Sequence, residues 1–314
     1  MDSTTQCPNK VALITTTTGQ DAFFLSRKLK SLGYRVIGLS GGSGIPHATF
    51  DTVLPFSFVE TNRIFDFLNK NQVNEIYNLA AKSSVADSWH NKELYFETNF
   101  HSLKRILDAL ISSSLRNEIK FLQVGSTDML GLTYIDQPLK PNKSWSPYGE
   151  SKLQSHFEAL KARDSGLFCS SIVVTNHDSS LRSSRFVIPK LAQQICDVIQ
   201  RNTSSVHLQN WNTTRDWAHA EDCTFAMYLS LQLSEPEELL IGTGVSMSLR
   251  DLAEAIRVQY DLKFQIKSES IPGRENDLEK IFLDVTKTKK ILNWNPQRTG
   301  PGTIFSIIED YLSR

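Results

Sequence analysis

The chain has 314 residues, 40% of them hydrophobic and 22% charged, and its 34 basic and 34 acidic side chains give a formal net charge of zero. This length allows one large domain or two unequal lobes, and the balanced charge argues against a nucleic-acid-binding protein. No stretch reaches the roughly 18 consecutive apolar residues of a membrane span, and the first residues lack the basic and apolar regions of a secretory signal. We therefore expect a cytoplasmic protein that contacts neither membrane nor nucleic acid.

The cysteines and histidines show no metal-binding pattern. The four cysteines are far apart, and the seven histidines form no His-Glu-x-x-His or His-x-His cluster. Buried or free thiols in a reducing compartment are the simplest interpretation, and we expect no metal site.

The first half of the chain alternates between short apolar runs and segments with apolar residues at helical spacing, which are typical of buried strands and amphipathic helices. The predicted strands are 11–14, 34–39, 75–80, 120–124 and 167–174, and the predicted helices are 23–32, 62–71, 92–112 and 146–162. This alternation predicts an α/β fold with a doubly wound, Rossmann-like parallel sheet and right-handed crossovers.

The alternation loosens after about residue 176. Helices are predicted near 186–201, 219–233, 248–258 and 301–313, separated by short strands and polar loops. We therefore predict a Rossmann domain over residues 1–175, to which some later elements return, and a smaller C-terminal substrate lobe formed mainly by residues 176–314.

The turn after the first strand has the position of a dinucleotide-binding fingerprint, where phosphate oxygens approach backbone N–H groups at a helix N-terminus. Aligned to Gly-x-x-Gly-x-x-Gly, the chain has Thr16, Gly19 and Ala22. Ala22 permits close helix–strand packing, but the β-branched Thr16 resists the tight turn that glycine allows. By itself, the pattern also fits a threonine-rich loop without a ligand.

The end of the second strand normally indicates which dinucleotide is bound. An acidic residue there binds the ribose hydroxyls of NAD, and an arginine binds the 2′-phosphate of NADP. The segment from Leu39 through Ser40 to Gly44 has neither, and its glycine and serine residues offer N–H and hydroxyl donors. NADP is slightly favoured, and NAD remains the alternative.

A tyrosine and a lysine at i, i+4 spacing predict acid–base chemistry. Tyr148 and Lys152 share one face near the start of a predicted helix, so that the ammonium can stabilise the phenolate. Ser126 and Asp128 follow the preceding strand and offer a hydroxyl for the substrate and a second proton-transfer group. The alternative interpretation is an ordinary helix after a turn capped by polar residues.

Several segments together resemble the GDP-mannose 4,6-dehydratase branch of the extended short-chain dehydrogenases, and somewhat less the GDP-4-keto-6-deoxymannose reductases. They are residues 12–21 (ALIT…TGQD), 75–89 (EIYNLAAKSSVADSW), 145–153 (WSPYGESKL), 176–180 (NHDSS), 215–222 (RDWAHAED) and 283–296 (LDVTKTKKILNWNP). The resemblance covers roughly residues 10–312. It implies a nicotinamide cofactor, a nucleotide-sugar substrate, and a homodimer or homotetramer that packs through helix 92–112 and the Tyr148 helix.

The resemblance also implies roles for individual residues. Ser126, Asp128, Tyr148 and Lys152 match catalytic positions, and Asp128 stands where the dehydratases carry a glutamate that removes the C5 proton. The matches on the cofactor side are Thr16, Gly19, Gln20, Asp21, Ser40, Leu79, Ala80, Ala81, Tyr148 and Lys152. The matches on the substrate side are Ser83, Asn176, Lys190, Arg215, Arg274 and Asp277.

The chain departs from the family pattern at Thr16, at the shortened loop Ser40–Gly44 and at Asp128, which is one methylene shorter than glutamate. Three functions therefore remain open. The first is a GDP-mannose 4,6-dehydratase, which the fingerprint turn and the carboxylate at Asp128 favour. The second is a 4-ketoreductase, which needs only Ser126, Tyr148 and Lys152. The third is a non-catalytic nucleotide-sugar-binding protein, which the altered glycine pattern favours.

Overall fold

The computed structural model describes residues 10–41, 44–132, 134–137, 139, 146–269 and 278–314. The chain forms two compact units. The first comprises Met1–Gly131, Pro141–Val174 and Thr224–Leu239, and the second comprises Leu132–Lys140, Thr175–Cys223 and Leu240–Arg314.

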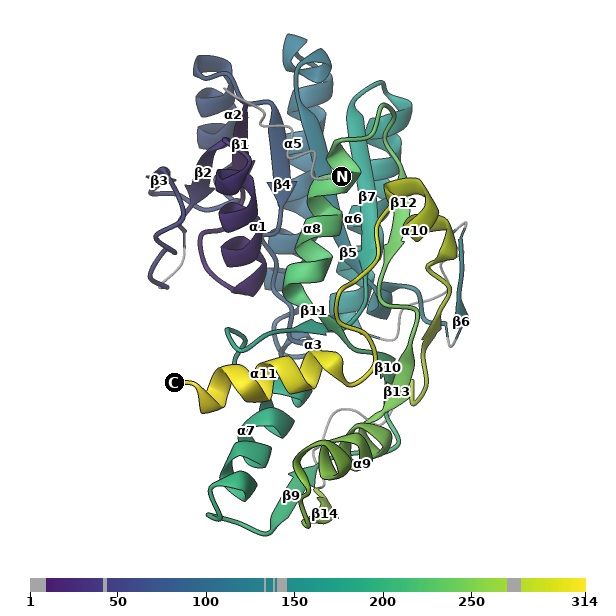
Figure 1. Cartoon of the computed structure of the whole chain (residues 1–314). Helices are drawn as coiled ribbons and strands as arrows, with labels where there is room; N and C mark the ends of the chain where they lie inside the picture. The colour runs from purple at the N-terminus through teal and green to yellow at the C-terminus, as the bar shows by residue number, and fades with distance from the viewer. Residues whose placement is uncertain (1–9, 42–43, 133, 138, 140–145, 270–277) are drawn as a thin grey trace. The chain divides into compact units, whose positions relative to one another are not determined.

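The first unit is built around a seven-stranded sheet with the strand order β12-β7-β5-β4-β1-β2-β3 (Figure 1). The strands are β1 (Val11–Ile14), β2 (Arg35–Leu39), β3 (Thr52–Leu54), β4 (Glu75–Asn78), β5 (Lys120–Ser126), β7 (Phe168–Val174) and β12 (Glu238–Ile241). Pairings among β1, β2, β3, β4, β5 and β7 are parallel. The chain leaves β1 toward β2 on one side and later returns to β4 on the other, so that β1 and β4 flank the topological switch point where α/β proteins bind ligands.

Helices cover both faces of this sheet (Figure 1). Their bounds are α1 (Gln20–Ser31), α2 (Thr61–Lys70), α3 (Val85–Ser88), α4 (Lys92–Phe96), η1 (Glu97–His101), α5 (Ser102–Ile111), η2 (Ser114–Asn117), η3 (Thr127–Met129), α6 (Pro147–Asp164) and α8 (Ala220–Leu231). Apolar residues of α2, α5 and α6 form one core with the sheet, and Leu13, Ile76 and Phe121 from three strands lie within it. The predicted Rossmann-like fold is confirmed.

Two local features differ from the prediction. The helix expected over 92–112 is interrupted by the π-helical turn η1, which takes up one extra residue per turn. The short strand β3 was not predicted, because Thr52–Leu54 has only three residues and neither face of it is fully buried.

The second unit has its own core, formed by α7 (Val187–Ile199), α9 (Leu249–Tyr260) and α11 (Gly302–Leu312) with Trp211 and Trp217. Its other elements are β6 (Tyr134–Ile135), β8 (His177–Asp178), β9 (Ser205–Leu208), β10 (Thr214–Asp216), β11 (Ala218–His219), β13 (Ser246–Ser248), β14 (Gln265–Ser268), β15 (Phe282–Leu283) and α10 (Thr286–Leu292). These strands pair in twos, as β10 with β13, β11 with β8, β14 with β9 and β15 with β6.

None of the helices in the described ranges combines the length and the apolar composition needed to cross a membrane. The same ranges contain no group of three or more His, Cys, Asp and Glu side chains that could hold a metal ion.

Candidate active site

The turn between β1 and α1 is tied to the end of β4 by a threonine that sequence reasoning missed. The Thr15 hydroxyl donates to Asn78 Oδ1 at 3.0 Å and accepts from the N–H groups of Leu79 at 3.0 Å and Ala80 at 2.8 Å. Thr15 is buried, so these bonds are shielded from water. They fix Leu79 and Ala80, which with the half-buried Ala81 follow β4, against the predicted fingerprint turn across the switch point.

The fingerprint turn has Thr16 at the position of the first glycine of the pattern. Thr16 Oγ1 accepts from the Thr18 N–H at 3.4 Å, and Gly19 adopts a φ of 87° to enter α1. Gly19 is the N-cap residue of α1, which begins at Gln20, and a glycine has no side chain that could cap the helix. Such a helix start can bind an anion through its N–H groups and dipole.

Thr17 gives a second indication that this turn accommodates a ligand. The residue is 1% exposed, and its Oγ1 has no hydrogen-bond partner within the described residues. A buried hydroxyl without a partner is destabilising unless another group supplies one. The turn therefore fits a phosphate-bearing cofactor, because a phosphate would satisfy both the helix N-terminus and this hydroxyl.

The loop after β2 folds back onto the same turn. The His47 N–H donates to Thr17 O at 3.0 Å, and His47 Nε2 lies 2.9 Å from Gly19 O. The half-buried Ser40, at the end of β2, donates its N–H to Leu54 O of β3 at 2.9 Å. Gly41 approaches Ser57 so closely that a Cβ atom on it would lie 1.8 Å from Ser57 Cβ. This crowding leaves no room for an arginine or an acidic side chain at Gly41.

Helix α6 presents the predicted tyrosine and lysine from one buried face. The helix starts where the sequence indicates, since Ser146 Oγ accepts from the Gly149 N–H at 3.0 Å and Pro147 occupies the first turn. Tyr148 is 7% exposed, and its ring packs edge-to-face on Tyr95 with centroids 6.4 Å apart. The Tyr95 hydroxyl in turn donates to Ser84 O at 2.7 Å, which connects this ring pair to the segment after β4.

Lys152 is buried beside the end of β5. Lys152 is 6% exposed, and its Nζ donates to Val124 O at 2.8 Å. Burial lowers the pKa of Lys152 to about 8, and the nearby Asp21 carboxylate offsets part of that shift. The structure thus brings Asp21 of the fingerprint turn and Lys152 of α6 within electrostatic reach of each other.

Ser126 and Asp128 form the turn that ends β5. Ser126 Oγ accepts from the Asp128 N–H at 3.3 Å and lies 3.5 Å from Asp128 Oδ2. Both residues are half-buried. These two contacts cap the turn and place a hydroxyl and a carboxylate side by side. Ser126 is two residues beyond Val124, whose carbonyl oxygen accepts from Lys152.

Asn99 is a buried polar residue of the site that the sequence prediction missed. Its amide accepts from the Lys82 N–H at 2.9 Å, donates to Lys82 O at 3.1 Å and donates to Ser151 Oγ at 3.0 Å. It thereby joins the segment after β4, which includes the exposed Ser83, to α6. The signal was present, because Asn99 is four residues from both Tyr95 and Leu103 on the apolar face of a predicted helix.

Three of the predicted substrate-side residues, Asn176, Lys190 and Arg215, contact neighbours within the second unit. Asn176 O accepts from the Ala218 N–H at 2.9 Å, and Lys190 Nζ forms an ion pair with Glu269 at 2.7 Å. Arg215 is 4% exposed, and its guanidinium donates to the carbonyl oxygens of Leu278 at 2.6 Å and Glu279 at 3.1 Å. Arg274 and Asp277 lie outside the described residues.

Known proteins share both the sequence pattern and the fold. The family model for GDP-mannose 4,6 dehydratase matches residues 13–304. The human GDP-mannose 4,6 dehydratase is 28% identical over 92% of this chain and 88% of its own length. The Vibrio cholerae enzyme of the same name is 26% identical, with 92% of this chain and 90% of the relative covered.

Two solved structures have the same fold at low sequence identity. RMD from Pseudomonas aeruginosa complexed with NADPH has a TM-score of 0.79 at 19% identity and covers 97% of this chain and 100% of its own. UDP-glucose 4-epimerase from Thermotoga maritima with UDP-glucose has a TM-score of 0.82 at 19% identity, with coverages of 96% and 99%. The resemblance inferred from the sequence motifs is confirmed. The chain belongs to the GDP-mannose 4,6 dehydratase family.

Proposed function

We propose that this protein is a nicotinamide-dependent nucleotide-sugar 4,6-dehydratase that acts on GDP-mannose or a closely related GDP-hexose. The observation that carries the proposal is the buried pair of Tyr148 and Lys152 on one face of α6, with Lys152 anchored to Val124 O at the end of β5. Ser126 and Asp128 follow directly on that strand. A family member needs this set of groups for hydride transfer coupled to elimination.

The four side chains divide the proton transfers. Tyr148 takes the proton of the C4 hydroxyl as that carbon is oxidised, and the Lys152 ammonium stabilises the phenolate. Ser126 hydrogen-bonds the same sugar oxygen. Asp128 removes the C5 proton and passes it to the departing C6 hydroxyl, which leaves as water. The proton held by Tyr148 then returns to the sugar at C5 as hydride reaches C6, so that both side chains regain their starting states. Bound NADP, or NAD, supplies the hydride acceptor for C4 and the hydride donor for C6.

The β1–α1 turn supports the cofactor assignment. Thr16, Gly19, Gln20 and Asp21 line the start of α1, where the unpartnered Thr17 hydroxyl also lies. Ser40 follows β2, and Leu79, Ala80 and Ala81 follow β4, the two strands on either side of β1. These residues would contact the adenosine and nicotinamide portions. Neither an acid nor an arginine follows β2, and the choice between NADP and NAD therefore rests on the N–H and hydroxyl donors of this loop.

We assign the nucleotide-sugar substrate to Ser83, Asn176, Lys190, Arg215, Arg274 and Asp277. Residues 1–175 would then act mainly as the dinucleotide-binding domain and residues 176–314 mainly as the nucleotide-sugar lobe. Lys190 would exchange its ion pair with Glu269 for a substrate group, whereas the buried Arg215 would act from its present position.

A 4-ketoreductase is the alternative function, and the geometry of Asp128 favours it. Its carboxylate lies 3.5 Å from Oγ of Ser126, the residue that caps this turn, and its side chain is shorter than the glutamate of the dehydratases. Two incubations of the purified protein distinguish the three functions. One contains GDP-mannose and NADP without added reductant, and the other contains the 4-keto sugar and NADPH. A dehydratase releases a 4-keto-6-deoxy product, a reductase leaves GDP-mannose unchanged but consumes NADPH with the 4-keto sugar, and a non-catalytic protein does neither.

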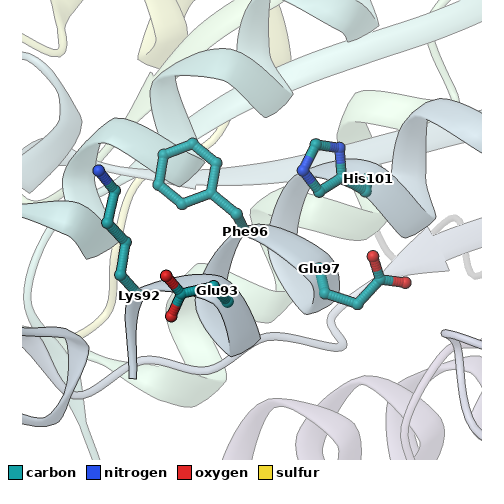
Figure 2. Close-up of a pocket in the computed structure, with 5 residues that line it drawn as sticks. All are labelled: Lys92, Glu93, Phe96, Glu97 and His101. Atoms are coloured by element: carbon teal, nitrogen blue, oxygen red, sulfur yellow. The ribbon is translucent and has the colours of Figure 1, made fainter. Parts of the chain in front are cut away.

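We further propose a cytoplasmic homodimer, or a homotetramer made of two such dimers, that packs through α4, α5 and α6. Leu94 on α4 is 47% exposed and Phe157 on α6 is 38% exposed, so that both helices present a large apolar side chain at the surface. Figure 2 shows the Phe96 ring between the Lys92 and His101 side chains in a shallow pocket of about 380 Å³, which Glu93 and Glu97 also line. Light scattering that gives the mass of a single 35.5 kDa chain contradicts this assembly.

A further inference from the structure

Helix α6 carries a third buried polar side chain on the face of Tyr148 and Lys152. Residues 148, 152 and 156 are spaced by four and therefore lie along one face of the helix. His156 is 1% exposed. Its Nδ1 lies 2.8 Å from Ser171 Oγ on β7, and its Nε2 lies 3.2 Å from the Glu238 carboxylate at the start of β12.

A serine, a histidine and a carboxylate in this order also form the nucleophilic relay of many hydrolases. Here Ser171 is 0% exposed and lies inside β7, which is flanked by β5 and β12 in the sheet. A substrate carbonyl therefore has no access to its hydroxyl. With the ring proton on Nε2, the ring donates to Glu238 and accepts from Ser171, and both nitrogens fix the ring on the sheet.

We propose that His156 is a positioning residue for Tyr148, which fixes the rotation of α6 on the sheet. Lys152 attaches this face of α6 to β5 through Val124 O, and His156 attaches it one turn later to β7 and β12. Two attachments along one face prevent the helix from rolling. The second lies about 12 Å along the axis from Tyr148, at 1.5 Å of rise per residue.

The buried hydrogen bonds give this attachment its directional strength. A roll of α6 would leave the imidazole, the Ser171 hydroxyl or the Glu238 carboxylate without partners in a shielded region, which is energetically costly. Tyr148 would move with the helix, and a displacement of about 1 Å at a reacting group can cost about 100-fold in rate. The inference rests on the proposed function only in taking Tyr148 as the proton acceptor.

Paired serines on β7 provide a matched test. Ser171→Ala and Glu238→Ala each remove one partner of His156 and leave the sequence of α6 intact. Both are expected to lower kcat about tenfold, with KM for GDP-mannose and the Kd for NADP changed by less than about twofold. Glu238→Gln retains an acceptor for Nε2–H and is expected to restore most of the wild-type kcat.

Ser170→Ala is the control for loss of a buried hydroxyl. Ser170 is also 0% exposed and lies on β7, but its Oγ accepts from the Glu237 N–H at 3.1 Å. Because Ser170 is adjacent to Ser171 in the strand, its side chain faces the opposite side of the sheet. This variant is expected to lose stability like Ser171→Ala and keep its kcat. Equal kcat values for Ser171→Ala and Ser170→Ala, or an effect of Ser171→Ala confined to KM, overturn the proposal.

A measurement without substrate separates this inference from the proposed function. Amide hydrogen exchange of the peptide covering residues 146–156 is expected to be faster in Ser171→Ala than in the wild type, and unchanged in Ser170→Ala. If the wild type does not convert GDP-mannose, the proposed function fails, and this comparison still decides the role of His156. Equal exchange rates in Ser171→Ala and Ser170→Ala overturn the positioning role of His156.

Discussion

Lys152 Nζ donates a 2.8 Å hydrogen bond to Val124 O while its residue is only 6% exposed, so that the ammonium is both anchored and shielded from water. This relationship joins α6 to β5, the strand that ends at Ser126 and is followed by the turn containing Asp128. Burial lowers the pKa of Lys152 to about 8, so that its charge is sensitive to pH near that value.

The lowered pKa of Lys152 predicts how stability depends on pH. Between about pH 8, the native value, and 10.5, the ordinary value, the unfolded state binds more protons than the native state, and the free energy of unfolding therefore rises with pH. Across this interval, the free energy of unfolding of the wild type should rise relative to that of Lys152→Met, by roughly 3 kcal/mol at most. Urea unfolding of both proteins at several pH values measures the difference, and a constant difference from pH 7.5 to 10 contradicts the lowered pKa.

Tyr148→Phe is expected to lower kcat by about 100-fold or more, because the variant has no group that can take the C4 hydroxyl proton. Its ring would still pack edge-to-face on Tyr95, so that the Tm and the Kd for NADP should stay close to the wild-type values. Tyr311→Phe on α11, where the ring packs against the core of the second unit, is the control for loss of a phenol and should retain its kcat. Substantial turnover by Tyr148→Phe removes this residue from the mechanism.

Thr17→Val tests whether the buried hydroxyl of the turn is reserved for a ligand. Valine has nearly the same shape and removes an unpartnered hydroxyl, and the variant without cofactor should be more stable by about 1 kcal/mol. The increase in Tm on adding NADP should be smaller in Thr17→Val than in the wild type, because the cofactor phosphate loses a donor. An unchanged increase shows that the hydroxyl does not contact the cofactor.

Asp128 distinguishes elimination from simple ketone reduction. Asp128→Asn keeps the side-chain shape and turn contacts with Ser126 but removes the base, and 4,6-dehydration should fall by about 100-fold or more. Asp128→Glu, which restores the longer side chain, should keep or raise the rate. Exchange of the C5 proton with deuterated solvent measures the step directly. If the Asn variant exchanges at the wild-type rate, Asp128 only caps the turn and the reductase function is favoured.

Periodicity and local capping predicted the parts of the fold that depend on neighbouring residues. The start of α6 is an example, since Ser146, Pro147 and the i, i+4 pair of Tyr148 and Lys152 are all visible in one short segment. The π-helical turn at Glu97–His101 was not visible in this way, because the apolar spacing continues through it. It brings Asn99 to both Lys82 and Ser151, which are distant in the sequence.

The polar contacts that organise the site were the least predictable part. Thr15 meets Asn78 across 63 residues, and His47 meets Gly19 across 28, through strand pairing and loop folding that no local pattern encodes. Residue types at the fingerprint could be identified from the sequence, but their partners could not. The same holds for His156, whose contacts to Ser171 and Glu238 require the order of β7 and β12 in the sheet.

The most direct measurement of the proposed dehydratase reaction follows the hydrogen on C4 of the sugar. GDP-mannose carrying deuterium at C4 is incubated with the protein and oxidised NADP, and the product is analysed by NMR. The proposal predicts a 4-keto-6-deoxy sugar with the deuterium at C6 and no net reduction of NADP, because the same cofactor molecule accepts and returns the hydride. Unchanged substrate, or a product without deuterium at C6 together with deuterium on the released cofactor, would contradict the proposal.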